Sequence, residues 1–312
     1  MTLGIKLRVN DSVSLSSFEK RWVPQQCYCG NKIWCLFTLM AFVLSSQILQ
    51  AQIGNDFVGA RSAAMGGYNV TLSDVWASNN NQAGLGFVED LAAGIYYENR
   101  FLLKATSYQA GAVVLPIKTG AFGISVASFG YSAYSETKAG LAYGKRLGKK
   151  CSVGLQMNYL NTSFTQEYGS KTTLTGAVGV IAKLSEEITL GVHVYNPSRS
   201  KLITYGNQRV PTIAKLGLDY QFSKKVTLAV STEKNLTLKA IVNAGIEYYI
   251  ADLLYIRGGI STNPSQYAFG FGMQLKDFKV EVSSSFHQTL GVTPGISIAY
   301  IKKKKAKKNA KP

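Results

Sequence analysis

The chain has 312 residues, of which 46% are hydrophobic and 16% charged, and its formal net charge is +17. Beyond residue 51 no run approaches 18 consecutive apolar residues, which excludes a helical membrane protein. Three of the four cysteines precede residue 36, so Cys151 stands alone in the rest of the chain and forms no internal disulfide.

Residues 33–46 form an apolar run that follows Lys32 and precedes the small residue Ala51. The run is shorter than the roughly 20 residues of a transmembrane helix. This arrangement predicts that residues 1–51 are an N-terminal extension and signal peptide, cleaved after Ala51. An N-terminal anchor helix is the alternative.

Residues 52–90 are rich in Gly, Ala and Asn and do not alternate in polarity. They contain a Gly-Ala-Arg…Met-Gly-Gly block, then an Asp, then Asn-x-Ala-Gly-Leu. Its residues are Gly59, Arg61, Met65, Gly66, Gly67, Asp74, Asn81, Ala83, Gly84 and Leu85. This block resembles the N-terminal block of PorV/PorQ-type proteins, which belong to the wider superfamily of FadL-like fatty-acid transporters. Gln82 stands where that family usually has Pro.

The resemblance implies that residues 52–90 form a hatch, a compact plug inside a fourteen-stranded barrel. Fourteen strands enclose a space too wide for their own side chains to fill. Gly and Ala let a polar backbone pack closely there, and the Asn residues can satisfy backbone groups. A periplasmic linker is the alternative interpretation.

From residue 91 to 301 the chain alternates between apolar residues and small or polar ones, most clearly over residues 266–275. A period of two places alternate side chains on opposite faces of a strand. Repeated many times after an export signal, this pattern is typical of an all-β, antiparallel transmembrane barrel of the outer membrane. A soluble β-sandwich also alternates and is the competing fold.

The alternation predicts fourteen strands, an even number that suits a closed barrel, although merging short segments would give twelve. The predicted ranges are 91–97, 107–116, 121–129, 137–146, 151–161, 172–183, 188–195, 212–221, 226–233, 239–249, 253–261, 266–275, 278–286 and 290–301.

Charged residues set the register of these strands, because a lipid-facing Lys or Arg costs about 2–4 kcal/mol at the bilayer midplane. Phe269, Phe271 and Met273 are therefore expected to face lipid. The residues expected to face the lumen are Lys215, Asp219, Lys239, Glu247, Arg257, Gln266, Gln274, Lys279, Glu281 and His193.

Connection lengths predict the orientation of the barrel. The short connections lie at the periplasmic end, and the two longest, 162–171 and 196–211, lie at the extracellular end. The longer of these carries Arg199, Lys201 and Arg209, which are candidates for contacting a protein partner. The tail 302–312 is strongly basic and is interpreted as solvated; an exported chain has no nucleic acid to bind.

The residues show no arrangement expected of an enzyme, metal site or cofactor site. Only two histidines occur, and no phosphate loop or Gly-x-Ser-x-Gly motif is found. Ser283, Ser285 and His287 share one strand face, but alternating serines are common on barrel walls. We therefore expect no enzyme activity and no cofactor.

Three functions remain open. The PorV/PorQ-type resemblance implies a type IX secretion accessory that works through secretion components or exported proteins, and this is the favoured interpretation. The wider FadL-like superfamily implies a channel for hydrophobic small molecules. A structural outer-membrane barrel, with membrane lipid as its only partner, is the third.

Overall fold

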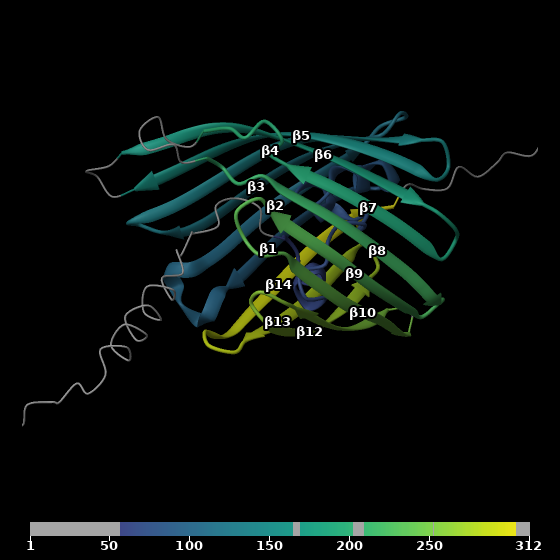
Figure 1. The fold of residues 1–312 in the computed structure, drawn as a ribbon. Coiled ribbons are helices and arrows are strands. Elements are labelled where there is room, and N and C mark those ends of the chain that lie inside the picture. Colours follow the sequence, from purple (N-terminus) through teal and green to yellow (C-terminus); the bar gives the residue numbers. More distant parts are fainter. Residues whose placement is uncertain (1–56, 165–168, 202–208, 252, 304–312) are drawn as a thin grey trace, which may run out of the picture. The chain divides into compact units, whose positions relative to one another are not determined.

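The computed structural model describes residues 57–164, 169–201, 209–251 and 253–303. Within them, fourteen antiparallel strands form one closed barrel in which β1 pairs with both β2 and β14 (Figure 1). The predicted signal peptide, with Ala51, and the tail beyond residue 303 lie outside the described residues.

The strands are β1 (Leu91–Asn99), β2 (Ser107–Pro116), β3 (Ala121–Tyr131), β4 (Tyr134–Leu147), β5 (Cys151–Phe164), β6 (Ser170–Lys183), β7 (Ile188–Tyr195), β8 (Ile213–Ser223), β9 (Val226–Asn235), β10 (Ile241–Ala251), β11 (Leu254–Ser261), β12 (Gln266–Leu275), β13 (Phe278–His287) and β14 (Gly291–Lys302).

The prediction of a closed barrel with fourteen strands is confirmed for the described residues, and the alternative of twelve strands is wrong. Two details of the prediction are also wrong. The connection 162–171 is shorter than expected, because β5 and β6 continue to pair up to Ser163 and Ser170. Lys239 does not face the lumen, because β10 begins only at Ile241 and Lys239 lies exposed in the preceding loop.

The predicted register is confirmed on β12 and β13. Phe269 and Phe271 are 65% and 56% exposed on the outer face, whereas Ala268, which points to the other face of β12, is buried. Glu281 is buried on the inner face. A charge-free apolar surface of this kind is what lipid requires of a barrel wall. No helix among the described residues is long and apolar enough to cross a membrane.

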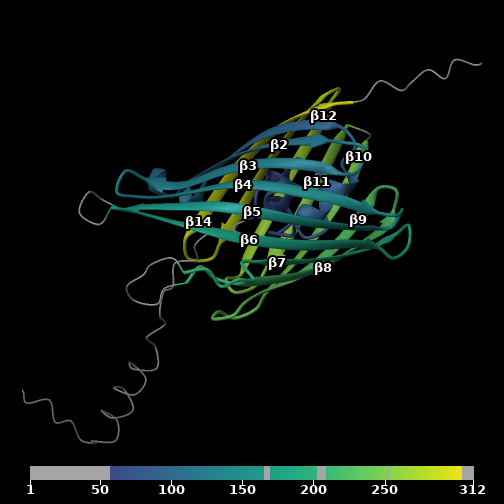
Figure 2. The same ribbon diagram turned by 90° about the horizontal axis from the view of Figure 1, so that it is seen from above.

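Residues 57–90, called the internal segment below, lie within the barrel (Figure 2). They comprise α2 (Ala60–Ala64) and two 3-10 helices, η1 (Val75–Ser78) and η2 (Gln82–Phe87). The helix α2 contacts β11 to β14, whereas η2 contacts β3 to β6, so the segment reaches across the lumen. Two further 3-10 turns, η3 (Arg100–Leu102) and η4 (Lys104–Thr106), connect β1 to β2.

Inward-facing glycines make room for the internal segment. On ten strands, a Cβ added to such a glycine would lie between 1.9 and 3.1 Å from atoms of the segment, which is closer than ordinary van der Waals contact. These glycines are Gly94, Gly123, Gly144, Gly154, Gly179, Gly191, Gly217, Gly245, Gly259 and Gly270. A larger side chain at any of them would compete with the segment for the same space.

Candidate functional site

The glycines of the N-terminal motif hold the backbone of the internal segment in shapes that other residues resist. Gly59 has φ 104°, and a Cβ there would lie 2.6 Å from the Trp76 ring. Gly66 has φ 70° and lies against the backbone of Ile260 on β11. Gly84 passes so close to Leu72 that a Cβ would lie 2.4 Å from its carbonyl oxygen. These positions therefore favour glycine strongly.

Asp74 and Asn81 begin the two 3-10 helices of the segment. The Asp74 carboxylate accepts a hydrogen bond from the Trp76 backbone N–H at 2.9 Å. The Asn81 side-chain oxygen accepts one from the Ala83 N–H at 3.2 Å, and its amide donates to the Val70 carbonyl at 2.6 Å. Both residues act as N-caps, which explains why short polar side chains stand there.

The remaining motif residues contribute packing. Met65, Ala83 and Leu85 are all buried, and Met65 packs against Gly245 of β10. Gly67, with φ 90°, lies next to the Phe57 ring. The structure thus brings every residue of the predicted motif into one folded unit, while its role as a hatch stays a prediction.

Arg61 joins the internal segment to a chain of charges on the barrel wall. Its guanidinium donates two hydrogen bonds to the Glu247 carboxylate, at 3.0 and 2.6 Å. Arg257 contacts the same carboxylate at 2.5 Å and Glu281 at 3.0 Å, and Lys279 reaches Glu281 at 2.9 Å. Glu247, Arg257 and Glu281 are almost fully buried, so each charge depends on its partners.

The charge of Arg61 is secured by this environment. Burial acts to lower the pKa of Arg61, but the Glu247 carboxylate, helped by Asp74, outweighs burial and holds that pKa well above its usual range. The Arg61 guanidinium is therefore charged while the internal segment is bound to the barrel wall.

Polar contacts elsewhere join the segment to β5 and β8. Gln82 donates a hydrogen bond from its side-chain amide to Gln156 at 2.6 Å, and Gln156 in turn donates to the Ser78 carbonyl at 2.7 Å. The Thr71 hydroxyl donates to Asp219 at 2.5 Å. The Gln82 side chain thus supplies a contact that a Pro at this position would lack.

The side of the lumen formed by β1 to β3 is apolar and aromatic. Trp76 of the internal segment meets Tyr96 edge-on with ring centroids 6.1 Å apart, and Tyr96 meets Tyr108 in the same way at 6.3 Å. Around them pack mainly alanines and valines of β1, β2 and β3, including Ala112 and Val114. This side offers mainly dispersion contacts, which suit an apolar molecule, and its buried Glu98 carboxylate on β1 is paired with Arg100.

At the end of this apolar side that is predicted to be extracellular lies an exposed apolar turn. Leu102 and Leu103 are 62% and 56% exposed there. Beneath them, Arg100 pairs with Glu98 at 2.8 Å and lies over the Tyr108 ring at 5.1 Å.

The side formed by β4 to β10 carries buried charged and polar residues. His193 faces inward, as predicted, and is almost fully buried. Lys215, its neighbour across the strands, forms an ion pair with Glu233 at 3.0 Å, and Lys138 lies 5.7 Å from the centre of the Tyr195 ring. A buried hydrophobic cluster of Leu160, Ala177, Tyr195, Val210 and Ile213 also packs on this side. The two walls of the lumen therefore differ in where the buried charges and amides that contact the internal segment lie: they are concentrated on this wall, whereas the wall of β1 to β3 is mainly apolar.

The residues proposed for partner contact lie close together where the structure describes them. Lys201 and Arg209 form an isolated β-bridge, and the Arg209 side chain donates to the Arg199 carbonyl at 3.1 Å. Residues 202–208 between them lie outside the described part. Binding of a partner by this connection stays a prediction.

The shared strand face of Ser283, Ser285 and His287 does not assemble a catalytic group in the described residues. His287 accepts hydrogen bonds through Nδ1 from the backbone N–H groups of Thr289 and Leu290 at 3.1 Å, and Ser283 bonds the Gly295 carbonyl. No cluster of three or more His, Cys, Asp or Glu side chains that could hold a metal ion occurs in the part of the chain that the structure describes.

Comparison with solved structures identifies the fold. A deletion mutant of the TodX monoaromatic hydrocarbon channel matches 81% of this chain over 100% of its own length, with a TM-score of 0.63 and 14% sequence identity. The Pseudomonas putida toluene transporter TodX matches 81% of this chain and 98% of its own (TM-score 0.60, 13% identity). A Pseudomonas aeruginosa FadL homologue matches 79% and 99% (TM-score 0.58, 13% identity).

The chain has the FadL-like barrel fold. No family model matches its sequence, and no curated protein matches it either. The wider part of the sequence resemblance, to FadL-like barrels, is therefore supported at the level of the fold. The narrower resemblance to PorV/PorQ-type proteins stays a prediction.

Proposed function

We propose that this chain forms an outer-membrane channel for small hydrophobic molecules, with the internal segment as its hatch. The observation that carries the proposal is the division of the lumen into an apolar and a polar wall. Hydrogen bonds and ion pairs from the segment go to β5, β7, β8 and β10. Toward β1 to β3 the segment instead presents Trp76, Val75 and Leu85 to apolar residues of the wall.

This division supports a particular route. An apolar molecule that enters beside β1 to β3 replaces one set of dispersion contacts with another, while the buried Glu98 carboxylate on this side keeps its partners Arg100 and Tyr96. The segment stays attached to the polar wall through Arg61 and Glu247 while its apolar edge moves. Exposed Leu102 and Leu103 lie where such a molecule would first meet the protein.

The fold adds independent support. Structures that match this chain along nearly their whole length include channels for monoaromatic hydrocarbons and a transporter for toluene. At 13–14% sequence identity these likenesses concern the barrel and not the ligand. The class of ligand is therefore proposed from the apolar wall, and its identity is left to the experiment.

The test is uptake of radiolabelled toluene and of a radiolabelled long-chain fatty acid by a Gram-negative host that lacks its own hydrophobic channel. The protein should accelerate entry of at least one probe. Leu102→Asn combined with Leu103→Asn should slow that entry severalfold. Leu236→Asn is the matched control, because Leu236 is 60% exposed in another connection at the same end of the barrel. Uptake equal to that of the empty host would contradict the proposal.

The secretion-accessory function favoured from the sequence rests on the N-terminal motif, the polar inward phase of the strands and the absence of a catalytic arrangement in the sequence. Deletion of residues 196–211 tests this function, with uptake of both probes measured alongside. Impaired surface delivery of exported proteins together with normal uptake of both probes would support the secretion function over the channel. A structural barrel would leave both readouts unchanged.

A further inference from the structure

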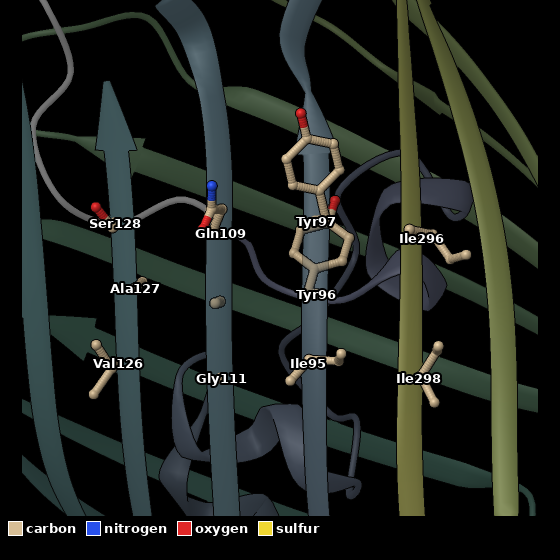
Figure 3. Close-up of a pocket in the computed structure, with 11 residues that line it drawn as sticks. Ile95, Tyr96, Tyr97, Gln109, Gly111, Val126, Ala127, Ser128, Ile296 and Ile298 are labelled. Carbon is tan, nitrogen blue, oxygen red and sulfur yellow. The ribbon is translucent and has the colours of Figure 1, made fainter. Parts of the chain in front are cut away.

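A groove runs along the outer, lipid-facing surface of the barrel where β1 and β2 carry small residues. Gly111 of β2 faces outward between Ile95 and Val126 (Figure 3). Ala93 of β1 faces outward beside Val113 and Tyr300. Two adjoining hollows of about 470 and 420 Å³ lie over these positions and share four lining residues, Ile95, Gly111, Val126 and Ile298.

The groove continues to the end of the barrel at which β1 begins and β14 ends. A third hollow of about 550 Å³ shares Tyr300 with the second and is lined by Leu91, Leu115, Pro116, Asp277, Lys302 and Lys303. Among the residues that line this hollow, Lys302, Lys303 and Asp277 give a net charge of +1. The sequence that follows carries five more lysines before residue 312. An apolar trough thus leads to a cationic rim.

The length of the groove corresponds to one leaflet of a bilayer. From Lys302 to Ile296 on β14 is six residue steps, or about 20 Å at ~3.3 Å per residue. With a strand tilt of about 40°, this is roughly 15 Å along the membrane normal, half of the ~30 Å hydrocarbon core. An acyl chain that starts at the rim would therefore end near the middle of the membrane.

We infer that this groove binds one molecule of anionic phospholipid, with an acyl chain over Gly111 and Ala93 and its phosphate at Lys302 and Lys303. The apolar walls exclude a charged occupant from the trough, and the two lysines favour a negative headgroup over a zwitterionic one. The inference rests on the proposed membrane location but not on what the lumen carries, so its test is independent of uptake.

The structure offers matched variants for this test. Gly111→Leu should fill the trough and still fold, because the nearest atom to an added Cβ is the Gly94 carbonyl oxygen at 3.8 Å. Gly176→Leu is the control: Gly176 also has open space, with the Gln156 carbonyl oxygen at 3.8 Å, but lies on β6, away from the groove. Lys302→Gln with Lys303→Gln removes the cationic rim, and Lys224→Gln with Lys225→Gln is its control in the turn after β8.

The measurement is native mass spectrometry of the purified full chain, titrated with phosphatidylglycerol and with phosphatidylcholine of the same acyl chains. The protein should bind one phosphatidylglycerol roughly tenfold more tightly than phosphatidylcholine. Gly111→Leu should weaken the binding of both lipids. The double Lys302→Gln, Lys303→Gln variant should lower the affinity for phosphatidylglycerol to that for phosphatidylcholine. Both control variants should bind the two lipids as the unmodified chain does.

Three results would overturn the inference. The first is equal affinity for the two lipids, and the second is phosphatidylglycerol binding that is the same in Gly111→Leu as in the unmodified chain. The third is a dimer of the chain that forms in every variant except Gly111→Leu. The last result would assign the groove to a second copy of the chain.

Discussion

The two walls of the lumen hold the internal segment by different forces. On the wall formed by β5 to β10, buried charges and amides of the barrel meet Arg61, Thr71 and Gln82 in specific pairs. On the wall formed by β1 to β3, Trp76 packs against Tyr96 and small apolar residues. Paired buried charges are costly to separate, whereas apolar contacts can be exchanged for others. The polar wall therefore anchors the segment and the apolar wall can release it.

The largest expected effect comes from breaking the anchor. Glu247→Gln leaves Arg61 and Arg257 facing each other without the carboxylate between them, which should weaken docking of the segment by about 3–5 kcal/mol. Hydrogen–deuterium exchange of residues 57–88 should become much faster than in the unmodified protein.

Glu233→Gln is the control for that change, because Glu233 pairs with Lys215 on the lumen wall away from Arg61. Unchanged exchange in Glu247→Gln would mean that the ion pairs do not hold the segment.

A smaller effect on docking is expected at the apolar wall. Trp76→Ala removes the ring that meets Tyr96 and should weaken local packing by about 3 kcal/mol. Because the anchor is intact, exchange should rise mainly around η1, and uptake of the hydrophobic probe should increase. Tyr220→Ala, on the lipid face of β8, serves as the control. Reduced uptake in Trp76→Ala would argue against a route along this wall.

The smallest effect is expected at Gln82 of the internal segment. Gln82→Pro loses the hydrogen bond to Gln156, which should cost about 1 kcal/mol. The backbone should accept Pro, since Asn81 before it is extended and Gln82 is the first residue of η2. Thermal unfolding should therefore show the same loss for Gln82→Pro and Gln82→Ala; a much larger loss for Pro would place an essential backbone hydrogen bond at residue 82.

The barrel could be predicted from the sequence because lipid imposes a strict rule on each strand. Every charge within a strand must avoid the lipid face, so Glu247, Arg257 and Glu281 fixed the register of β10, β11 and β13 without any tertiary information. The rule has no force beyond a strand's end, and for that reason Lys239 was misplaced. Nor does it set the length of a hairpin, and β5 and β6 pair as far as Ser163 and Ser170.

The contacts across the lumen could not be predicted in the same way. The pairing of Arg61 with Glu247 joins residues 186 positions apart, and nothing in either local pattern specifies the partner. One signal was available and was missed: most strands carry a glycine on the inward phase, such as Gly154 on β5 and Gly217 on β8. Such a series indicates that another part of the chain passes close to the wall.

The account's central claim is that the segment releases from the apolar wall while the polar wall holds it. Two engineered disulfides, made in a Cys151→Ser background, test this directly. Ser78→Cys with Gly123→Cys ties the segment to β3, and Val70→Cys with Gly217→Cys ties it to β8. The two sites are similar in reach, since a Cβ on the glycine lies 2.8 and 2.9 Å from the partner Cβ, so a small shift brings each pair to bonding distance.

The measurement is uptake of the hydrophobic probe before and after reduction of each disulfide. The account predicts that the tie to β3 stops uptake until a reductant is added, while the tie to β8 leaves uptake unchanged. Uptake that is stopped by the β8 tie and unaffected by the β3 tie would contradict it.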